Sequence, residues 1–107
     1  MTQVRRAALE AAGIDVASAL ERMMGSEALL ERLLGKFPED KNLPVLREAL
    51  ESGDPGRAAA AAHTLKGVCG NLSMTELYGL FTRQVDALRR GDLAAARALM
   101  ADIEPAA

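Results

Sequence analysis

The alanine-rich segment at residues 58–72, which reads AAAAAHTLKGVCGNL, restricts the fold more than any other part of the chain. When these residues are placed on a helix at about 100° per residue, most of the apolar ones fall within roughly 60° of Leu65. They are Ala58, Ala61, Ala62, Val68, Cys69 and Leu72. A stripe of this kind predicts a helix that packs one narrow, alanine-lined face into a core.

The only histidine of the chain falls on the opposite side of this predicted helix. His63 lies roughly 160° from Leu65, and Lys66 lies roughly 100° out, at the edge of the same side. The remaining members of this side are Ala59, Ala60, Gly67 and Gly70. Glycine inside a helix costs about 1 kcal/mol relative to alanine and often marks the close approach of a large group. An exposed histidine is most often plain surface, but these neighbours predict an accessible imidazole with a cation nearby and room for a partner.

The residues His63-Thr64-Leu65-Lys66-Gly67, followed by Asn71-Leu72, resemble the signature of histidine-phosphotransfer (HPt) domains. The preceding alanine run, the helical segments on both sides and the domain length are also similar to that family. The resemblance implies that His63 is the phosphorylated residue and that Lys66 lies beside the phosphoryl group. It also implies that Gly67 lets a receiver domain approach. Gly70, Ala59 and Ala60 share this side of the predicted helix, so we expect them to contact the partner as well.

Two positions depart from the family pattern. The family commonly has glycine ten residues after the histidine, where this chain has Ser73. A Leu-Glu pair that is usual late in the next helix appears here as Gln84-Val85. Neither change touches the nucleophile, but they leave open which side chain of the next helix supports the imidazole. Gln84, expected at the edge of that helix's inner stripe, is a candidate for this role and for partner contact.

Composition places the chain in a broad class. At 107 residues it is expected to form one domain, residues 1–107, with a modest core. Half of its residues are apolar but only 3% are aromatic, which suits close-packed helices better than a sheet sandwich. A net charge of −2 gives no reason to expect nucleic-acid binding. We expect a monomer.

The sequence also favours a cytoplasmic protein. No apolar run approaches the roughly 20 residues that a membrane span needs, and no basic-then-apolar leader opens the chain. The single cysteine cannot form an internal disulfide, so a reducing cytoplasm is the simplest location, with no membrane association expected.

Cap and turn residues divide the chain into successive amphipathic segments. We expect helices at residues 2–12, 16–24, 27–37, 43–52 and 55–72, then from a capping box of Ser73 and Glu76 to Gly91, and from Asp92 to Pro105. The inner face of the sixth helix is predicted to carry Met74, Leu77, Tyr78, Phe81, Val85 and Leu88. No segment alternates like a strand. Short loops favour antiparallel neighbours, so we expect an all-α, up-and-down four-helix bundle with short N-terminal helices packed across one end.

Other chemistries fit the sequence poorly. Cys69 lies about 120° around and about 9 Å along the helix from His63, too far for a nucleophile and base pair. One histidine and one cysteine are a poor inventory for zinc, so no metal site is expected. No Gly-rich loop follows a strand, and Thr64 replaces the acidic residue that typically follows the histidine of a sensor kinase. We therefore expect a phosphoryl carrier that does not use ATP and is not a complete enzyme.

The resemblance implies reversible transfer between His63 and the aspartate of a response-regulator receiver domain, with hybrid histidine kinases as further partners. Lys66 would offset charge on the transferring oxygens, and Mg²⁺ would come from the partner, so no cofactor of its own is expected. Two alternatives stay open. The chain could be a module cut from a hybrid or chemotaxis-type kinase, or a helical receiver-binding module that is not phosphorylated.

Overall fold

The computed structural model describes residues 1–106, and most of them are helical. Their order is α1 (Gln3–Ala11), α2 (Val16–Arg22), α3 (Glu27–Lys36), the 3₁₀ turn η1 (Phe37–Glu39), α4 (Asn42–Ser52), α5 (Pro55–Asn71), α6 (Thr75–Arg89) and α7 (Leu93–Ala106). Within this range the only strand-like pairing is an isolated bridge between Ile14 and Met74. The all-α prediction is confirmed.

Most helices begin at the cap residue that the sequence predicts. The side chains of Asp15, Ser26 and Asp54 accept hydrogen bonds from backbone N–H groups in the first turns of α2, α3 and α5. The carboxylate of Asp92 does the same for α7, accepting from Ala95 N at 3.0 Å. These bonds satisfy donors that a helix start otherwise leaves unpaired, so the boundaries follow from local chemistry.

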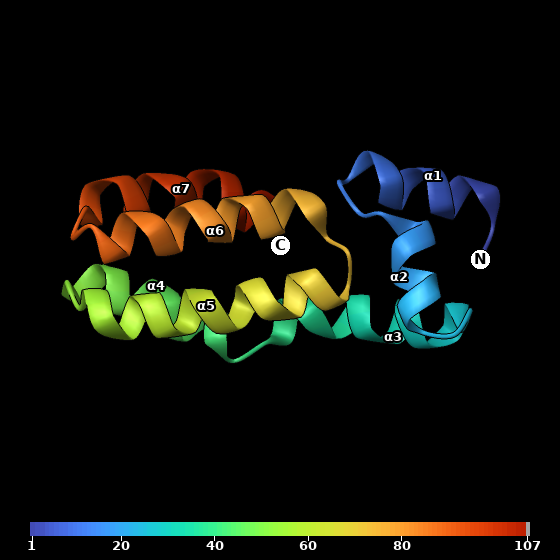
Figure 1. Cartoon of the computed structure of the whole chain (residues 1–107), viewed down its shortest axis with the longest axis horizontal. Coiled ribbons are helices and arrows are strands. Elements are labelled where there is room, and N and C mark those ends of the chain that lie inside the picture. The colour runs from blue at the N-terminus through green and yellow to red at the C-terminus, as the bar shows by residue number, and fades with distance from the viewer. Residues whose placement is uncertain (107) are drawn as a thin grey trace.

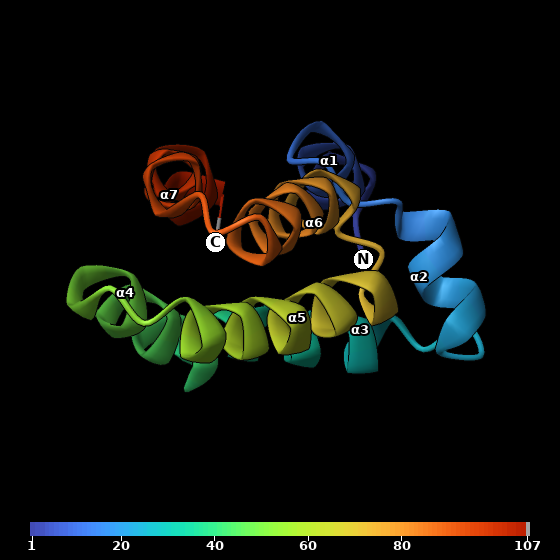
Figure 2. The same cartoon turned by 60° about the vertical axis from the view of Figure 1, so that its left-hand side comes forward.

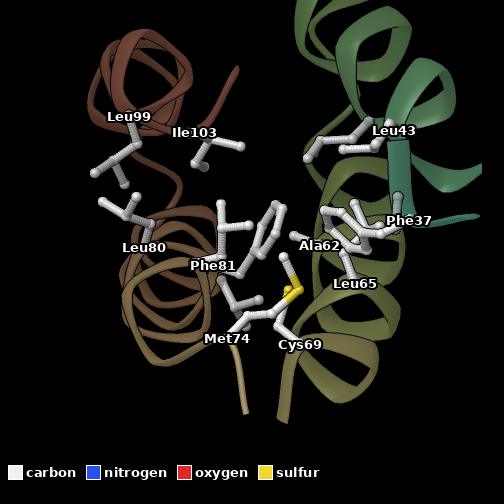
Figure 3. Close-up of a cluster of buried hydrophobic side chains, with 14 of the residues drawn as sticks. Phe37, Leu43, Ala62, Leu65, Cys69, Met74, Leu80, Phe81, Leu99 and Ile103 are labelled. Atoms are coloured by element: carbon white, nitrogen blue, oxygen red, sulfur yellow. The ribbon is translucent and has the colours of Figure 1, made fainter. Parts of the chain in front are cut away.

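The four C-terminal helices contact one another in a closed order. α5 packs against α4 on one side and α6 on the other, α6 packs against α7, and α7 returns to α4. The pair α4 and α5 forms one layer and the pair α6 and α7 the other (Figures 1 and 2). Between them Phe81 points toward Ala62 and Leu65 (Figure 3). All three are buried, so the alanine-lined face of α5 lies in the core as predicted.

The first two helices lie at one end of the molecule (Figure 1). The loop before α2 is joined to the loop between α5 and α6 by backbone and side-chain hydrogen bonds. Asp15 N donates to Ser73 O at 2.8 Å, and Thr75 Oγ1 donates to Gly13 O at 2.7 Å. The N-terminal segment is therefore anchored beside the C-terminal end of the histidine-bearing helix.

The predicted capping box at Ser73 is wrong. α6 begins at Thr75, its N-cap is Met74, and no side chain caps it. Ser73 is buried and has φ of +52°, a left-handed conformation that glycine adopts more readily than other residues. Its hydroxyl accepts from Arg22 Nη1 at 3.0 Å and donates to Ser18 Oγ at 3.1 Å, so it is bonded to α2 and does not cap α6.

The inner face of α6 is rotated relative to the prediction. Tyr78, which was expected in the core, is 42% exposed, whereas Gln84, expected at the edge, is 0% exposed. Leu77, Phe81, Val85 and Leu88 are buried as predicted, and Leu80 and Ala87 join them. The buried stripe is therefore centred on the row Leu77, Phe81, Gln84 and Leu88, and Tyr78 turns outward beside α5.

Candidate functional site

His63 lies in the middle of α5 on the side that faces solvent. Its side chain is exposed, whereas Leu65 on the opposite face of the helix is fully buried. Ala60, one turn earlier, is exposed, and Ala59 is half-buried. The prediction that the imidazole faces water is confirmed, and small side chains border it on the N-terminal side.

The two glycines beyond His63 have different surroundings. A Cβ atom added to Gly67 would meet nothing within 4 Å, so the surface one turn after the histidine is open. A Cβ atom added to Gly70 would lie 3.3 Å from Cε2 and 3.4 Å from Cδ2 of Tyr78. Gly70 thus makes room for an aromatic ring of the protein itself, and Gly67 alone leaves free space for an approaching group.

Lys66 lies over the same aromatic ring. Its Nζ is 5.4 Å from the centroid of Tyr78, which is a cation–π distance. Lys66 forms no ion pair with a carboxylate in the part of the chain that the structure describes. The ring therefore holds the ammonium near the histidine face without neutralising its charge. By the histidine face we mean the side of α5 that carries Ala59, Ala60, His63, Lys66, Gly67 and Gly70.

A surface hollow of about 470 Å³ opens beside this face. It lies between α2, α5 and α6, and its lining consists of Arg22, Gly67, Gly70, Asn71, Thr75 and Tyr78. Gly67 is one turn from His63, so the hollow begins next to the imidazole and extends toward the C-terminal end of α5. Sequence reasoning missed Arg22 and Tyr78, because neither belongs to the histidine-bearing helix.

Gln84 does not belong to this surface. Its Nε2 donates to Ala96 O at 3.1 Å and to the sulfur of Met100 at 3.3 Å, both on α7. The predicted partner contact of Gln84 is wrong, because its side chain is fully buried. The signal was present in the sequence, since Gln84 lies three residues after Phe81 and four before Leu88, at core spacing.

Further candidates for a site of chemistry are the buried cysteine and the acidic side chains of the described residues. Burial, and to a lesser extent the charge of Asp40, raises the pKa of the Cys69 thiol to about 12, so the thiol is neutral and unreactive near neutral pH. Among residues 1–106, no group of three or more His, Cys, Asp or Glu side chains is arranged to hold a metal ion. None of the described helices is both long and apolar enough to cross a bilayer.

An exposed imidazole is a nucleophile, and a lysine that pairs with no carboxylate of residues 1–106 can offset negative charge on an anionic group. A comparison with protein families matches residues 28–106 to the Hpt domain. No curated protein and no solved structure matches the chain. The matched range covers about three quarters of the chain, including α4 to α7 and the whole histidine face. The chain therefore belongs to the Hpt domain family, the histidine-containing phosphotransfer modules of phosphorelays.

Proposed function

We propose that this protein is a phosphorelay carrier in which His63 accepts a phosphoryl group from the aspartate of one response-regulator receiver domain and passes it to another. The observation that carries the proposal is the open surface at Gly67, one turn from an exposed imidazole. A plain surface histidine has no need of a glycine there, because glycine weakens the helix.

In the proposed step, a ring nitrogen of neutral His63 attacks the phosphorus of the aspartyl phosphate in line. The N–P bond forms as the P–O bond to the aspartate breaks, and the aspartate leaves as a carboxylate. The proton on the other ring nitrogen passes to solvent. Lys66 offsets negative charge on the transferring oxygens, and the partner supplies Mg²⁺. The same steps in reverse deliver the phosphoryl group from His63 to the aspartate of a second receiver.

The scaffold in this proposal is an antiparallel up-and-down four-helix bundle of α4 to α7. The closed order of contacts among these helices and the short connections between them support it. We further propose that the protein acts as a monomer in a reducing cytoplasm, where a hybrid kinase supplies its phosphate. The buried free thiol of Cys69 is compatible with such a compartment.

The test is labelling of the His63→Gln variant. We expect wild-type protein to take phosphate from a phosphorylated receiver and from a small phosphoramidate donor, giving an acid-labile, alkali-stable adduct. His63→Gln should fold normally, because the side chain is exposed, and should not be labelled. Thr64→Ala is the matched control, since Thr64 is the neighbouring exposed nucleophile and its hydroxyl bonds to Ala60 O at 3.1 Å. Persistent labelling of His63→Gln would overturn the proposal.

The same experiment separates the alternative of a receiver-binding module that is not phosphorylated. If the protein is such a module, the wild type and the His63→Gln variant should bind a receiver with equal affinity, and neither should become labelled. A carrier gains label in the wild type only.

A further inference from the structure

Arg22, the last residue of α2, reaches the hollow beside the histidine face from outside the matched family range of residues 28–106. Its Nη1 donates to the carbonyl oxygen of Gly70 and to Ser73 Oγ, the latter at 3.0 Å. These two bonds hold the guanidinium against the C-terminal part of α5. A segment that the family model does not cover therefore forms one wall of the hollow.

No carboxylate of residues 1–106 neutralises the positive charge of Arg22. Arg22 forms no ion pair with any carboxylate of residues 1–106, and its Nε and Nη2 groups donate no hydrogen bond within that range. Lys66, beside the same hollow, is likewise without an acidic partner there. Two unpaired cations from different helices thus flank one opening.

The surface between these cations is shaped for close approach of another molecule. Gly67 leaves open space, and the exposed ring of Tyr78 offers a flat apolar area. Gly70 lies about 10 Å along the helix axis from His63, so Arg22 contacts α5 about two turns beyond the histidine. Arg22 is therefore too far away to touch the reacting atoms and is placed to contact the surface of a docked partner.

The chemistry of that partner follows from the proposed function, on which this inference rests. A protein that presents an aspartyl phosphate with bound Mg²⁺ must hold the metal with carboxylates, so the surface near its phosphate is acidic. We propose that Arg22 is a specificity-determining docking residue that binds a carboxylate on the receiver surface. An arginine already held by two hydrogen bonds loses little conformational entropy on binding, and its free N–H groups suit a carboxylate.

The test compares Arg22→Gln with Arg89→Gln. Both remove one exposed arginine, but Arg89 ends α6, about 16 Å along that helix from Tyr78, and does not line the hollow. The probe is the receiver domain that labels wild-type protein fastest in a panel of purified receivers, with its dissociation constant measured at low and high salt. We expect Arg22→Gln to bind about tenfold more weakly with a reduced salt dependence, and Arg89→Gln to match wild type.

Arg22→Lys separates charge from support of the fold. If Arg22 binds a carboxylate, lysine should keep the salt dependence of the wild type and lose only part of the affinity. If Arg22 only braces α5, both Arg22 variants should melt earlier and bind more weakly with the wild-type salt dependence, which would overturn the inference. Unchanged affinity in Arg22→Gln would also overturn it.

Failure of this inference is distinguishable from failure of the proposed function. Wild-type protein that accepts phosphate on His63 while Arg22→Gln binds the receiver normally refutes the docking role alone. Wild-type protein that no receiver and no small donor can label refutes the carrier function, and the docking role with it.

Discussion

The ammonium group of Lys66 lies over the ring of Tyr78, 5.4 Å from its centroid. Lys66 is on α5, one turn beyond His63, and Tyr78 is on α6, so two helices together determine where the cation lies. The ring also packs against Gly70, where an added Cβ would come within 3.3 Å of it. The position of the lysine therefore depends on a glycine that has no direct part in the chemistry.

Removing the ring should slow transfer. We expect Tyr78→Ala to reduce the rate at saturating receiver about two- to fivefold, because an exposed cation–π contact is worth about 0.5–1 kcal/mol. Tyr78→Phe keeps the ring and should transfer at nearly the wild-type rate. Single-turnover kinetics would check both variants, and equal rates for Tyr78→Ala and Tyr78→Phe would show that the ring does not position Lys66.

Removing the lysine should affect the rate more than the affinity. Lys66→Ala is expected to slow transfer by about tenfold or more, while receiver binding weakens less, because charge on the transferring oxygens is greatest in the transition state. The measurement is the dependence of the transfer rate on receiver concentration. A loss confined to affinity, with an unchanged rate at saturation, would mean that Lys66 only docks the partner.

Alanine substitutions at Gly67 and Gly70 should affect the stability of the fold differently. Gly67→Ala should raise the free energy of unfolding by up to about 1 kcal/mol, because alanine favours helix and its Cβ meets no atom. Gly70→Ala should gain less or lose stability, because its Cβ must displace the ring of Tyr78. Denaturant unfolding of both variants gives the comparison. Equal gains would show that the ring moves aside without cost.

A larger side chain at Gly67 should separate stability from function. Gly67→Leu is expected to keep or raise the melting temperature yet accept phosphate from a receiver about a hundredfold more slowly, since transfer tolerates displacement of only about 1 Å. A small phosphoramidate donor should still label it. Wild-type rates with the receiver would show that this surface is not used for docking.

Gln84 should influence stability without influencing receiver binding. Its Oε1 is buried with no hydrogen-bond partner in the described chain, while Nε2 is bonded to α7. Gln84→Met removes both polar atoms at similar volume, so we expect a change within about 1 kcal/mol. Gln84→Ala leaves a cavity and should cost about 2–4 kcal/mol. Unfolding curves and receiver affinities of both variants check this, and a loss of affinity in Gln84→Met would contradict it.

Cys69 should make the fold sensitive to alkali. Its folded pKa of about 12 lies above the ordinary value of 9.0, so the unfolded thiol ionises first as the pH rises. The neutral thiol makes its full contribution to the free energy of unfolding below about pH 9. This contribution is lost as the pH rises toward about 12, at up to about 1.4 kcal/mol per pH unit. Above pH 9, the free energy of unfolding of the wild type should therefore fall relative to that of Cys69→Ala. A constant difference across that range would contradict the shifted pKa.

Local chemistry was enough to predict where most helices begin and which face of α5 is exposed to solvent. Asp15, Ser26 and Asp54 cap helices where the sequence indicates, because a cap bonds to N–H groups only two or three residues away. His63 faces solvent because the apolar residues of its own helix occupy the other side. Each of these conclusions depends on residues close together in the sequence, so periodicity and capping rules suffice for them.

Only the tertiary structure decided which residues join His63 on its surface. Arg22 and Ser73 are about fifty residues apart in sequence, and their hydrogen bond exists because the α2 end packs beside the α5–α6 loop. That packing also holds Ser73 in a left-handed conformation and prevents it from capping α6. The outward position of Tyr78 depends on where α5 lies beside α6. The spacing of apolar residues predicts roughly where the buried stripe of a helix lies. The neighbouring helices decide which residues at its edge are buried, because burial depends on the atoms packed against them.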